Sequence, residues 1–485
     1  ATVLSFQSSK PTLQTAAKAR NKKLENFAHH EVEMAFPKTK LFSDLDRRIF
    51  ATAVPAMLNL AIVPIVSSVE TMWIGQLGVA LALAGQSAAN SAFLTGFFLV
   101  SFLPTIAAPL VATSVGSGNI DEAQQRVCDT LFLCNVLGCV GTLLLVAYPE
   151  IGLSVVLPSD APAMEFAAPY LRSRALSMLP ALLSATGFAA FRGMLDTVTP
   201  LKISLTTSAL KLGLDPLFIF RSSFGFVGAT LATLTSELLS GAIYLKLLIQ
   251  RKLVTLHRLM HPPSLSSLVP LLRGGVTMLV RQLAINVGMI SSGRCAQTID
   301  MTGVAAAAYG IVMQMYTVGF VAHVAMQGAA AALVPSSLAR SGRKEARVVA
   351  DRLYLWSLLV GLFIGMAQYF SLPYLIPLFS TLPEVQEAVR VPSTIACIIH
   401  VINGPRFAGE GILLGLGCFR DLTLVTVMGI SIMVSTLASP LGKGLEGIMW
   451  CNLIFCAYQA ISLCGHYSFF GPLSQRKRDS HLKDG

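Results

Sequence analysis

The sequence predicts an all-α polytopic membrane protein with twelve transmembrane helices in two six-helix bundles, related by a pseudo-twofold axis along the membrane normal. Three observations lead to this fold class. Apolar residues make up 54% of the 485 residues and charged residues only 13%, about half of the ~25% found in soluble domains. Twelve apolar stretches are long enough to cross ~30 Å of hydrocarbon as helices. Finally, the two halves of the chain resemble each other.

The twelve stretches set the order of the elements. We expect helices at 50–74, 80–112, 124–148, 163–191, 200–220, 225–249, 271–297, 302–332, 348–376, 388–415, 421–440 and 445–470. Several contain proline, which membrane helices tolerate and which often marks a kink. This composition excludes a soluble enzyme, a collagen-like chain, a disordered chain and a disulfide scaffold.

Lysine and arginine cluster in alternate connections, at 38–48, 246–273, 340–352 and 476–483. By the positive-inside rule, both termini and these connections face the cytosol, or the stroma in a plastid. The net charge of +11 is therefore a topology signal, and we expect no nucleic-acid partner. Residues 1–36 are basic and rich in Ser, Thr and Ala, which fits either the end of a transit peptide or an ordinary cytosolic arm.

Four pairs of segments repeat in order at a nearly constant shift of about 220 residues, the span of one repeat unit. One pair is GVALALAG at 78–85 and GVAAAAYG at 303–310. Six spans in each half place the repeats parallel, an arrangement found in transporters with a midplane site between or within the lobes. The expected organisation is an N-terminal arm or transit remnant at 1–40, a first lobe at 41–249, a cytosolic linker at 250–270, a second lobe at 271–470 and a basic tail at 471–485.

Several motifs resemble the multidrug and toxic compound extrusion (MATE) family. They are ETMWIGQLG at 70–78, FRGMLDTVTPL at 191–201, LGLDPLFIF with GFVGATLAT within 212–233, and FAGEGILLGLGCFRD at 407–421. The last is similar to the DinF branch, which includes plant plastid-envelope members. The resemblance covers about residues 41–470 and implies secondary active export of small organic solutes, driven by proton or sodium entry and by rocking of the two lobes.

Charged residues inside hydrocarbon cost about 2.5–3.5 kcal/mol each on insertion scales, so those inside the spans need a reason. Lys211 and Asp215 are four residues apart, share one helix face and can pair. The resemblance places Glu70 and Asp215 on the cation-coupling acids of prokaryotic members. We expect Glu70, Lys211 and Asp215 to form one cluster of net charge −1, which a single proton would neutralise. The alternative is a purely structural Lys–Asp pair.

Lys211 occupies what resembles the family's Asn position. An ammonium group cannot ligate sodium and would repel it. This departure predicts coupling to protons rather than sodium, or attraction of an anionic substrate. A sodium-coupled exporter remains the alternative.

In the second lobe, Glu410 falls on the DinF-branch acid of helix 10, with Asn403 about two turns earlier on nearly the same face. Arg281 matches a basic position of helix 7, where it could balance Glu410, bind a substrate carboxylate or extend to the membrane interface. Structural bonding of Glu410 is the alternative to a functional role. Arg192 and Asp196 are expected to act structurally, by pairing and by capping the next helix.

The remaining chemistry is sparse. Nine cysteines show neither metal spacing nor a disulfide framework, and no P-loop is present. His323 and His400 fit core packing better than pH sensing. We therefore expect no enzyme, no catalytic or metal-binding residue and no cofactor, with protons as the driving ion.

The expected partners are a small organic substrate and membrane lipids, and the expected state is a monomer in the plastid envelope or, failing that, in the plasma or vacuolar membrane. The leading interpretation is a proton-coupled exporter of drug-like or metabolite solutes, including aromatic or anionic ones. A lipid or lipid-linked flippase is the alternative. Its interior is expected to carry several cations, whereas the residues of this chain predict a mixed or acidic one.

Overall fold

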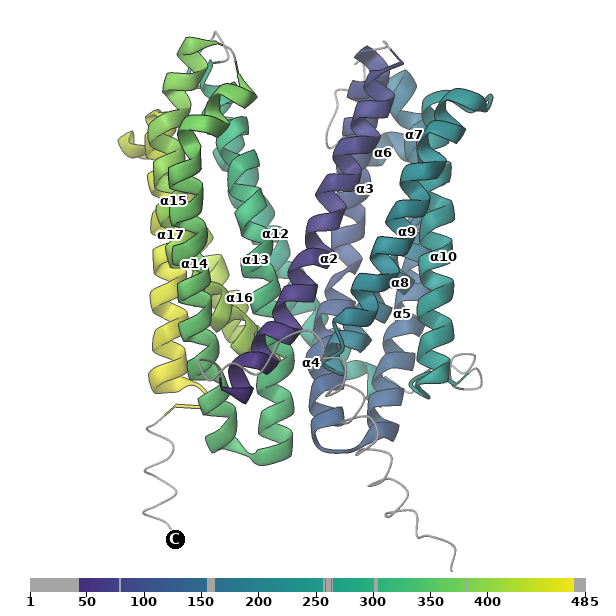
Figure 1. Cartoon of the computed structure of the whole chain (residues 1–485), viewed down its shortest axis with the longest axis vertical. Helices are drawn as coiled ribbons and strands as arrows, with labels where there is room; N and C mark the ends of the chain where they lie inside the picture. The colour runs from purple at the N-terminus through teal and green to yellow at the C-terminus, as the bar shows by residue number, and fades with distance from the viewer. Residues whose placement is uncertain are drawn as a thin grey trace, which may run out of the picture. The chain divides into compact units, whose positions relative to one another are not determined.

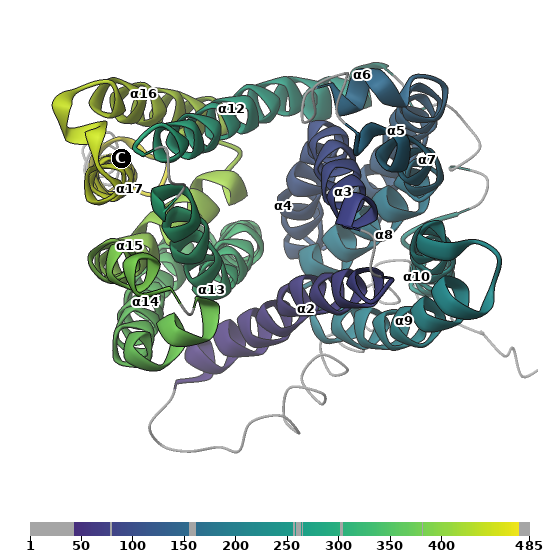
Figure 2. The same cartoon turned by 90° about the horizontal axis from the view of Figure 1, so that it is seen from above.

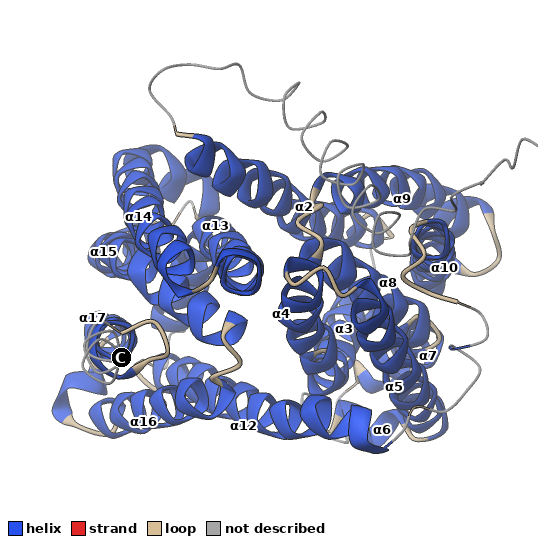
Figure 3. Ribbon diagram, turned by 90° about the horizontal axis from the view of Figure 1, so that it is seen from below, coloured by secondary structure: helices blue, strands red, loops and turns tan. Residues whose placement is uncertain are grey.

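The computed structural model describes residues 43–77, 80–154, 162–255, 258, 263, 265–300, 304–380 and 382–474. In this part of the chain the secondary structure is helical throughout, without a strand (Figure 3). The predicted N-terminal arm, most of the basic tail and part of the 250–270 linker lie outside the described residues. All contacts reported below lie within the compact unit that begins at Thr52.

The helices of the first half follow the predicted order (Figure 1). They are α2 (Asp44–Gly75), α3 (Ala80–Val100), α4 (Phe102–Gly116), α5 (Ile120–Ala147), α6 (Pro149–Leu153), α7 (Met164–Ala175), α8 (Met178–Gly193), α9 (Val198–Pro216), η1 (Leu217–Arg221), η2 (Gly225–Val227) and α10 (Gly228–Gln250).

The second half continues in the same manner. Its helices are α12 (Leu265–Gln297), α13 (Val304–Ser341), α14 (Arg343–Phe379), α15 (Pro383–Gly415), α16 (Phe419–Leu437), η3 (Pro440–Lys443), α17 (Leu445–Gly465) and η4 (His466–Phe470).

Ten described helices are long and apolar enough to cross a membrane, and α7 with α8, bent by 51°, forms an eleventh span. The twelfth is α12, whose 33 residues suffice for a crossing. Its three arginines, Arg273, Arg281 and Arg294, make it less apolar than the other spans. The structure confirms the predicted all-α membrane fold.

The helices pack as two groups that follow the two halves of the chain (Figure 2). In the N-terminal bundle, α8 contacts α4, α5 and α10, and α3 contacts α7. In the C-terminal bundle, α15 is central and contacts α13, α14 and α17, while α12 pairs with α16. The backbones approach closely here, since a Cβ on Gly404 would lie 2.3 Å from the carbonyl oxygen of Ser357.

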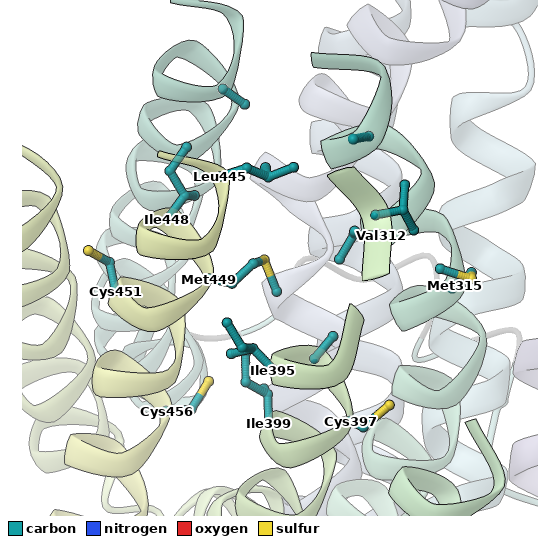
Figure 4. Packing of buried hydrophobic residues seen from close by; sticks show 14 of the residues in the cluster. Val312, Met315, Ile395, Cys397, Ile399, Leu445, Ile448, Met449, Cys451 and Cys456 are labelled. Carbon is teal, nitrogen blue, oxygen red and sulfur yellow. The ribbon is translucent and has the colours of Figure 1, made fainter. Parts of the chain in front are cut away.

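A continuous apolar core holds the outer part of the C-terminal bundle together. Figure 4 shows Val312, Met315, Ile395, Ile399 and Met449, which project from α13, α15 and α17 into this core. Moving these side chains from lipid into the bundle gives no hydrophobic gain, because lipid tails are as apolar as the core. Close van der Waals packing is therefore the main attraction between the helices.

The bundles contact each other through an apolar cluster that we call the seal. Its buried members are Ile106, Met278, Ala331, Leu413, Leu414, Leu422 and Leu463. They come from α4 of one bundle and from α12, α13, α15, α16 and α17 of the other. α4 and α13 also touch directly, because a Cβ on Gly116 would lie 2.6 Å from the carbonyl oxygen of Ser336. The seal lies toward the helix ends that the positive-inside rule assigns to the cytosol.

Candidate functional site

The N-terminal bundle holds a buried cluster of two carboxylates and one lysine, which we call the acid–lysine cluster. Lys211 Nζ lies 2.7 Å from Glu70 Oε2 and 3.0 Å from Asp215 Oδ2. The sequence spacing explains half of this geometry, because Lys211 and Asp215 are separated by one turn of α9. Glu70 is brought to them by α2. The structure thus places together the three residues that the sequence predicts to be neighbours, and their role stays a prediction.

Two neutral side chains complete the coordination of Glu70. The hydroxyl of Tyr170 on α7 donates a hydrogen bond of 2.6 Å to Glu70 Oε1, and Gln86 on α3 donates one of 3.3 Å to the same atom. Neither residue can be predicted from the sequence, because neutral polar side chains in apolar helices give no distinctive signal.

The acid–lysine cluster is nearly closed to solvent. Asp215 has no exposed surface, and Glu70 and Lys211 are each 7% exposed. Its formal charge is −1. Elsewhere in this bundle, Glu237 on α10 interacts with Ser184 and Arg174. A buried excess charge is costly in a membrane interior, so the cluster is suited to bind one cation.

The C-terminal bundle holds a larger network centred on Glu410 of α15, which we call the arginine network. Arg281 Nη2 of α12 lies 2.5 Å from Glu410 Oε2, and Gln327 of α13 donates a hydrogen bond of 2.8 Å to the same oxygen. Arg406 Nε, one turn before Glu410, lies 3.2 Å from Oε1 as an ion pair without an aligned hydrogen bond. Of the roles that the sequence left open for Arg281, the structure shows the balancing of Glu410.

Further hydrogen bonds extend the arginine network across the bundle. Thr426 on α16 accepts from Arg281 Nε at 3.2 Å and from Gln459 of α17 at 3.1 Å. Asn403 accepts from Arg406 Nη1 at 3.1 Å and donates to the Tyr316 hydroxyl at 2.6 Å. Asn403 therefore belongs to the network through Arg406, without bonding Glu410 itself.

Arg406 is the residue that changes the charge balance of this bundle. With Arg281 and Glu410 it gives the network a formal charge of +1. The interior predicted to be mixed or acidic is therefore mixed in the C-terminal bundle, with one arginine in excess. The signal was in the sequence, because Arg406 lies inside the predicted span 388–415, four residues from Glu410.

A histidine pair lies beside the arginine network. His323 Nε2 and His400 Nδ1 are 3.1 Å apart, and neither side chain has exposed surface. Their outer ring nitrogens find no hydrogen-bond partner among the described residues. The pair is therefore packed in the core, as expected, but only half satisfied.

The two signature residues of the 191–201 segment behave differently from each other. Asp196 caps α9, since it accepts from the backbone N–H of Thr199 at 3.0 Å, and it pairs with Arg251 at 3.6 Å. The expected capping is confirmed. Arg192 has no ion pair within the described residues; its guanidinium packs over Phe188 and against Gly328 of the other bundle.

Comparisons with known proteins agree with this architecture. The chain is 25% identical over 426 residues to "Protein DETOXIFICATION 44, chloroplastic" of Arabidopsis thaliana, covering 85% of this chain and 80% of that protein. It is 23% identical over 401 residues to "Probable multidrug resistance protein NorM" of Thermotoga maritima, covering 80% and 83%.

A solved structure described as an outward-facing conformation of a multidrug resistance MATE family transporter matches the fold. Its TM-score is 0.80 at 19% identity, with 91% of this chain and 97% of the other covered. The sequence model of the family described as MatE matches residues 55–217 and 282–438. The chain belongs to the MATE family of membrane transporters.

Proposed function

We propose that this integral membrane protein is a secondary active antiporter that exports small organic solutes in exchange for protons. The observation that carries the proposal is the acid–lysine cluster. It is a buried group of charge −1 that one proton would neutralise, formed by residues of α2 and α9. A proton that enters or leaves would weaken or strengthen the ion pair that joins Glu70 of α2 to Lys211 of α9, which is the differential stabilisation that coupling requires.

The position of Lys211 favours protons over sodium as the driving ion. Its ammonium group is within 3.2 Å of both carboxylates and occupies the space between them. A sodium ion would need several oxygen ligands there and would be repelled by the ammonium charge. We propose that no cofactor takes part and that the protein acts as a monomer.

The seal supports an alternating-access cycle. In this structure the bundles touch through the seal on the cytosolic side, which corresponds to the state closed to the cytosol. Opening the seal would expose the interior to the cytosol for substrate loading. The relatives named chloroplastic favour the plastid envelope as the location, which the localisation of a fluorescent fusion of the protein would test.

The test is transport in proteoliposomes under separate pH and sodium gradients, with a panel that contains a cationic dye, a neutral aromatic amide and an aromatic carboxylate. We expect uptake to follow the pH gradient in the absence of sodium. Glu70→Gln and Asp215→Asn should abolish the gradient dependence, whereas Glu165→Gln, an exposed acid in the first turn of α7, should not. Uptake that follows sodium at constant pH would refute proton coupling.

A lipid flippase is the second candidate, and the arginine network is the observation that favours it. Two buried arginines close together are typical of a phosphate site. The sequence predicted only one of them, Arg281, at this position. Scrambling of a fluorescent anionic lipid that depends on Arg281 would support this candidate. Its absence under conditions of active solute transport would exclude it.

A further inference from the structure

The charge of the arginine network is not balanced within the protein. Arg281 and Arg406 both pair with the single carboxylate of Glu410. The other members that bond to these three residues, Gln327, Thr426 and Asn403, are neutral. No other acid contacts the network in the part of the chain that the structure describes. The arginine network therefore keeps one uncompensated positive charge.

This charge is held away from water. Arg281 and Arg406 are 8% and 7% exposed, and Glu410 is 1% exposed. An uncompensated cation inside a membrane bundle is unfavourable unless a counter-ion reaches it. The position therefore favours any ligand that brings one negative charge.

The two arginines differ in their freedom to accept such a ligand. The Arg406 guanidinium lies between the rings of Phe407 and Phe455, at 4.8 and 4.9 Å from their centroids, and donates to Asn403 and Cys456. Arg281 uses Nε for Thr426 and Nη2 for Glu410. Its Nη1 makes no hydrogen bond to the described residues and is not fully enclosed. Arg406 Nη2 likewise makes no hydrogen bond to the described residues, but the rings of Phe407 and Phe455 flank its guanidinium, so Arg281 is the arginine more open to a ligand.

The arginine network forms a layer directly behind the seal. Met278 of the seal is one turn from Arg281, Leu422 is one turn from Thr426, and Leu414 is one turn from Glu410. The relation repeats on α13 and α17 with the pairs Gln327–Ala331 and Gln459–Leu463. When the seal opens toward the cytosol, a solute that enters between the bundles comes within about one helical turn of this layer.

We infer that the arginine network is a binding site for an organic monoanion, whose carboxylate bonds the free Nη1 of Arg281. The inference rests on the proposed exporter function and names its substrate class. A single negative charge neutralises the network, whereas a dianion would leave it negative. Export of one monoanion against one entering proton moves two elementary charges per cycle, so an inside-negative potential drives both movements.

The test uses three small aromatic probes of similar size: benzoate (one negative charge), phthalate (two) and benzyltrimethylammonium (one positive). Binding to the full-length protein in a neutral phosphatidylcholine membrane is measured by the shift in melting temperature, and transport is measured in parallel. We expect wild type to bind benzoate at least tenfold more tightly than either of the other probes. Arg281→Gln should abolish this preference, and Arg281→Lys should retain most of it. Arg294→Gln, an exposed arginine of the same helix, should behave as wild type.

Glu410→Gln should strengthen anion binding instead of weakening it. Loss of the carboxylate raises the network charge to +2, so benzoate binding should be retained and phthalate binding should increase. If Glu410 were a cation site instead, Glu410→Gln would lose benzyltrimethylammonium binding and gain nothing for anions. That result would overturn the inference.

Other outcomes separate the inference from the proposed function. Equal binding of benzoate to wild type and to Arg281→Gln would overturn the inference, even if pH-driven export of a cationic dye persists. Absence of pH-driven export, with benzoate binding still dependent on Arg281, would refute the exporter function and leave the anion site intact. A further outcome is that phosphatidylglycerol, added to the membrane, displaces benzoate and binds more tightly than benzoate does. That outcome would assign the site to a lipid phosphate and overturn the organic-solute inference.

Discussion

Replacing Lys211 by methionine should destabilise the protein in a pH-dependent way. The ammonium group lies 2.7 Å from Glu70 and 3.0 Å from Asp215, and its removal leaves a buried cluster of charge −2. Breaking a buried ion pair by removing one partner costs about 3–5 kcal/mol. That cost applies at alkaline pH, where both carboxylates are charged. It shrinks as the pH falls, because each proton taken up removes one uncompensated charge.

The assay is the melting temperature of purified wild type and Lys211→Met between pH 5 and pH 9. Lys246→Met, an exposed lysine of α10, serves as the control and should melt like wild type at every pH. The gap between Lys211→Met and wild type should be large at pH 9 and small at pH 5. A gap that is constant with pH, or no larger than that of the control, would show that Lys211 does not hold two charged carboxylates together.

Two further substitutions test the packing and the capping. Gly319→Ala should destabilise the protein by about 1–3 kcal/mol, because its Cβ would lie 2.7 Å from Cε1 of His400. Gly310→Ala on the same helix meets nothing within 4 Å and should be neutral or slightly stabilising in the same melting assay; equal effects would refute the close approach. Asp196→Ala should cost about 1 kcal/mol through loss of the cap on α9, and an unchanged melting temperature would show that the bond to Thr199 contributes nothing.

The fold could be predicted almost completely from the sequence. Helices that cross a membrane must satisfy their backbone groups internally and present about 20 apolar residues each, so composition and spacing define them. The sequence predicts the bent pair α7 and α8 as one span, 163–191, without the bend of 51°. That bend depends on contacts with neighbouring helices, which no local pattern specifies.

The acid–lysine cluster could be predicted in part. The pair Lys211–Asp215 follows from one turn of helix, and Glu70 joined it only through the family resemblance. Tyr170, which completes the cluster 100 positions away from Glu70, could not be identified. Long-range pairs between neutral polar groups leave no trace in a single sequence.

The arginine network was predicted less well. Glu410, Asn403 and Arg281 were identified, but Arg406 was overlooked, although its distance of four residues from Glu410 is the same helical spacing that revealed Lys211 and Asp215. Without Arg406, Glu410 is balanced by Arg281 alone, so the excess positive charge of the C-terminal bundle is not predicted.

The central claim is that the acid–lysine cluster takes up one proton. Infrared difference spectroscopy of the protein in membranes, recorded between alkaline and acidic pH, measures this directly through the carbonyl stretch of a protonated, buried carboxyl group. We predict one such band in wild type, shifted or lost in Glu70→Gln and in Asp215→Asn, and unchanged in Glu165→Gln. A spectrum that is identical in wild type and both cluster variants would contradict the claim, because the proton would then bind elsewhere.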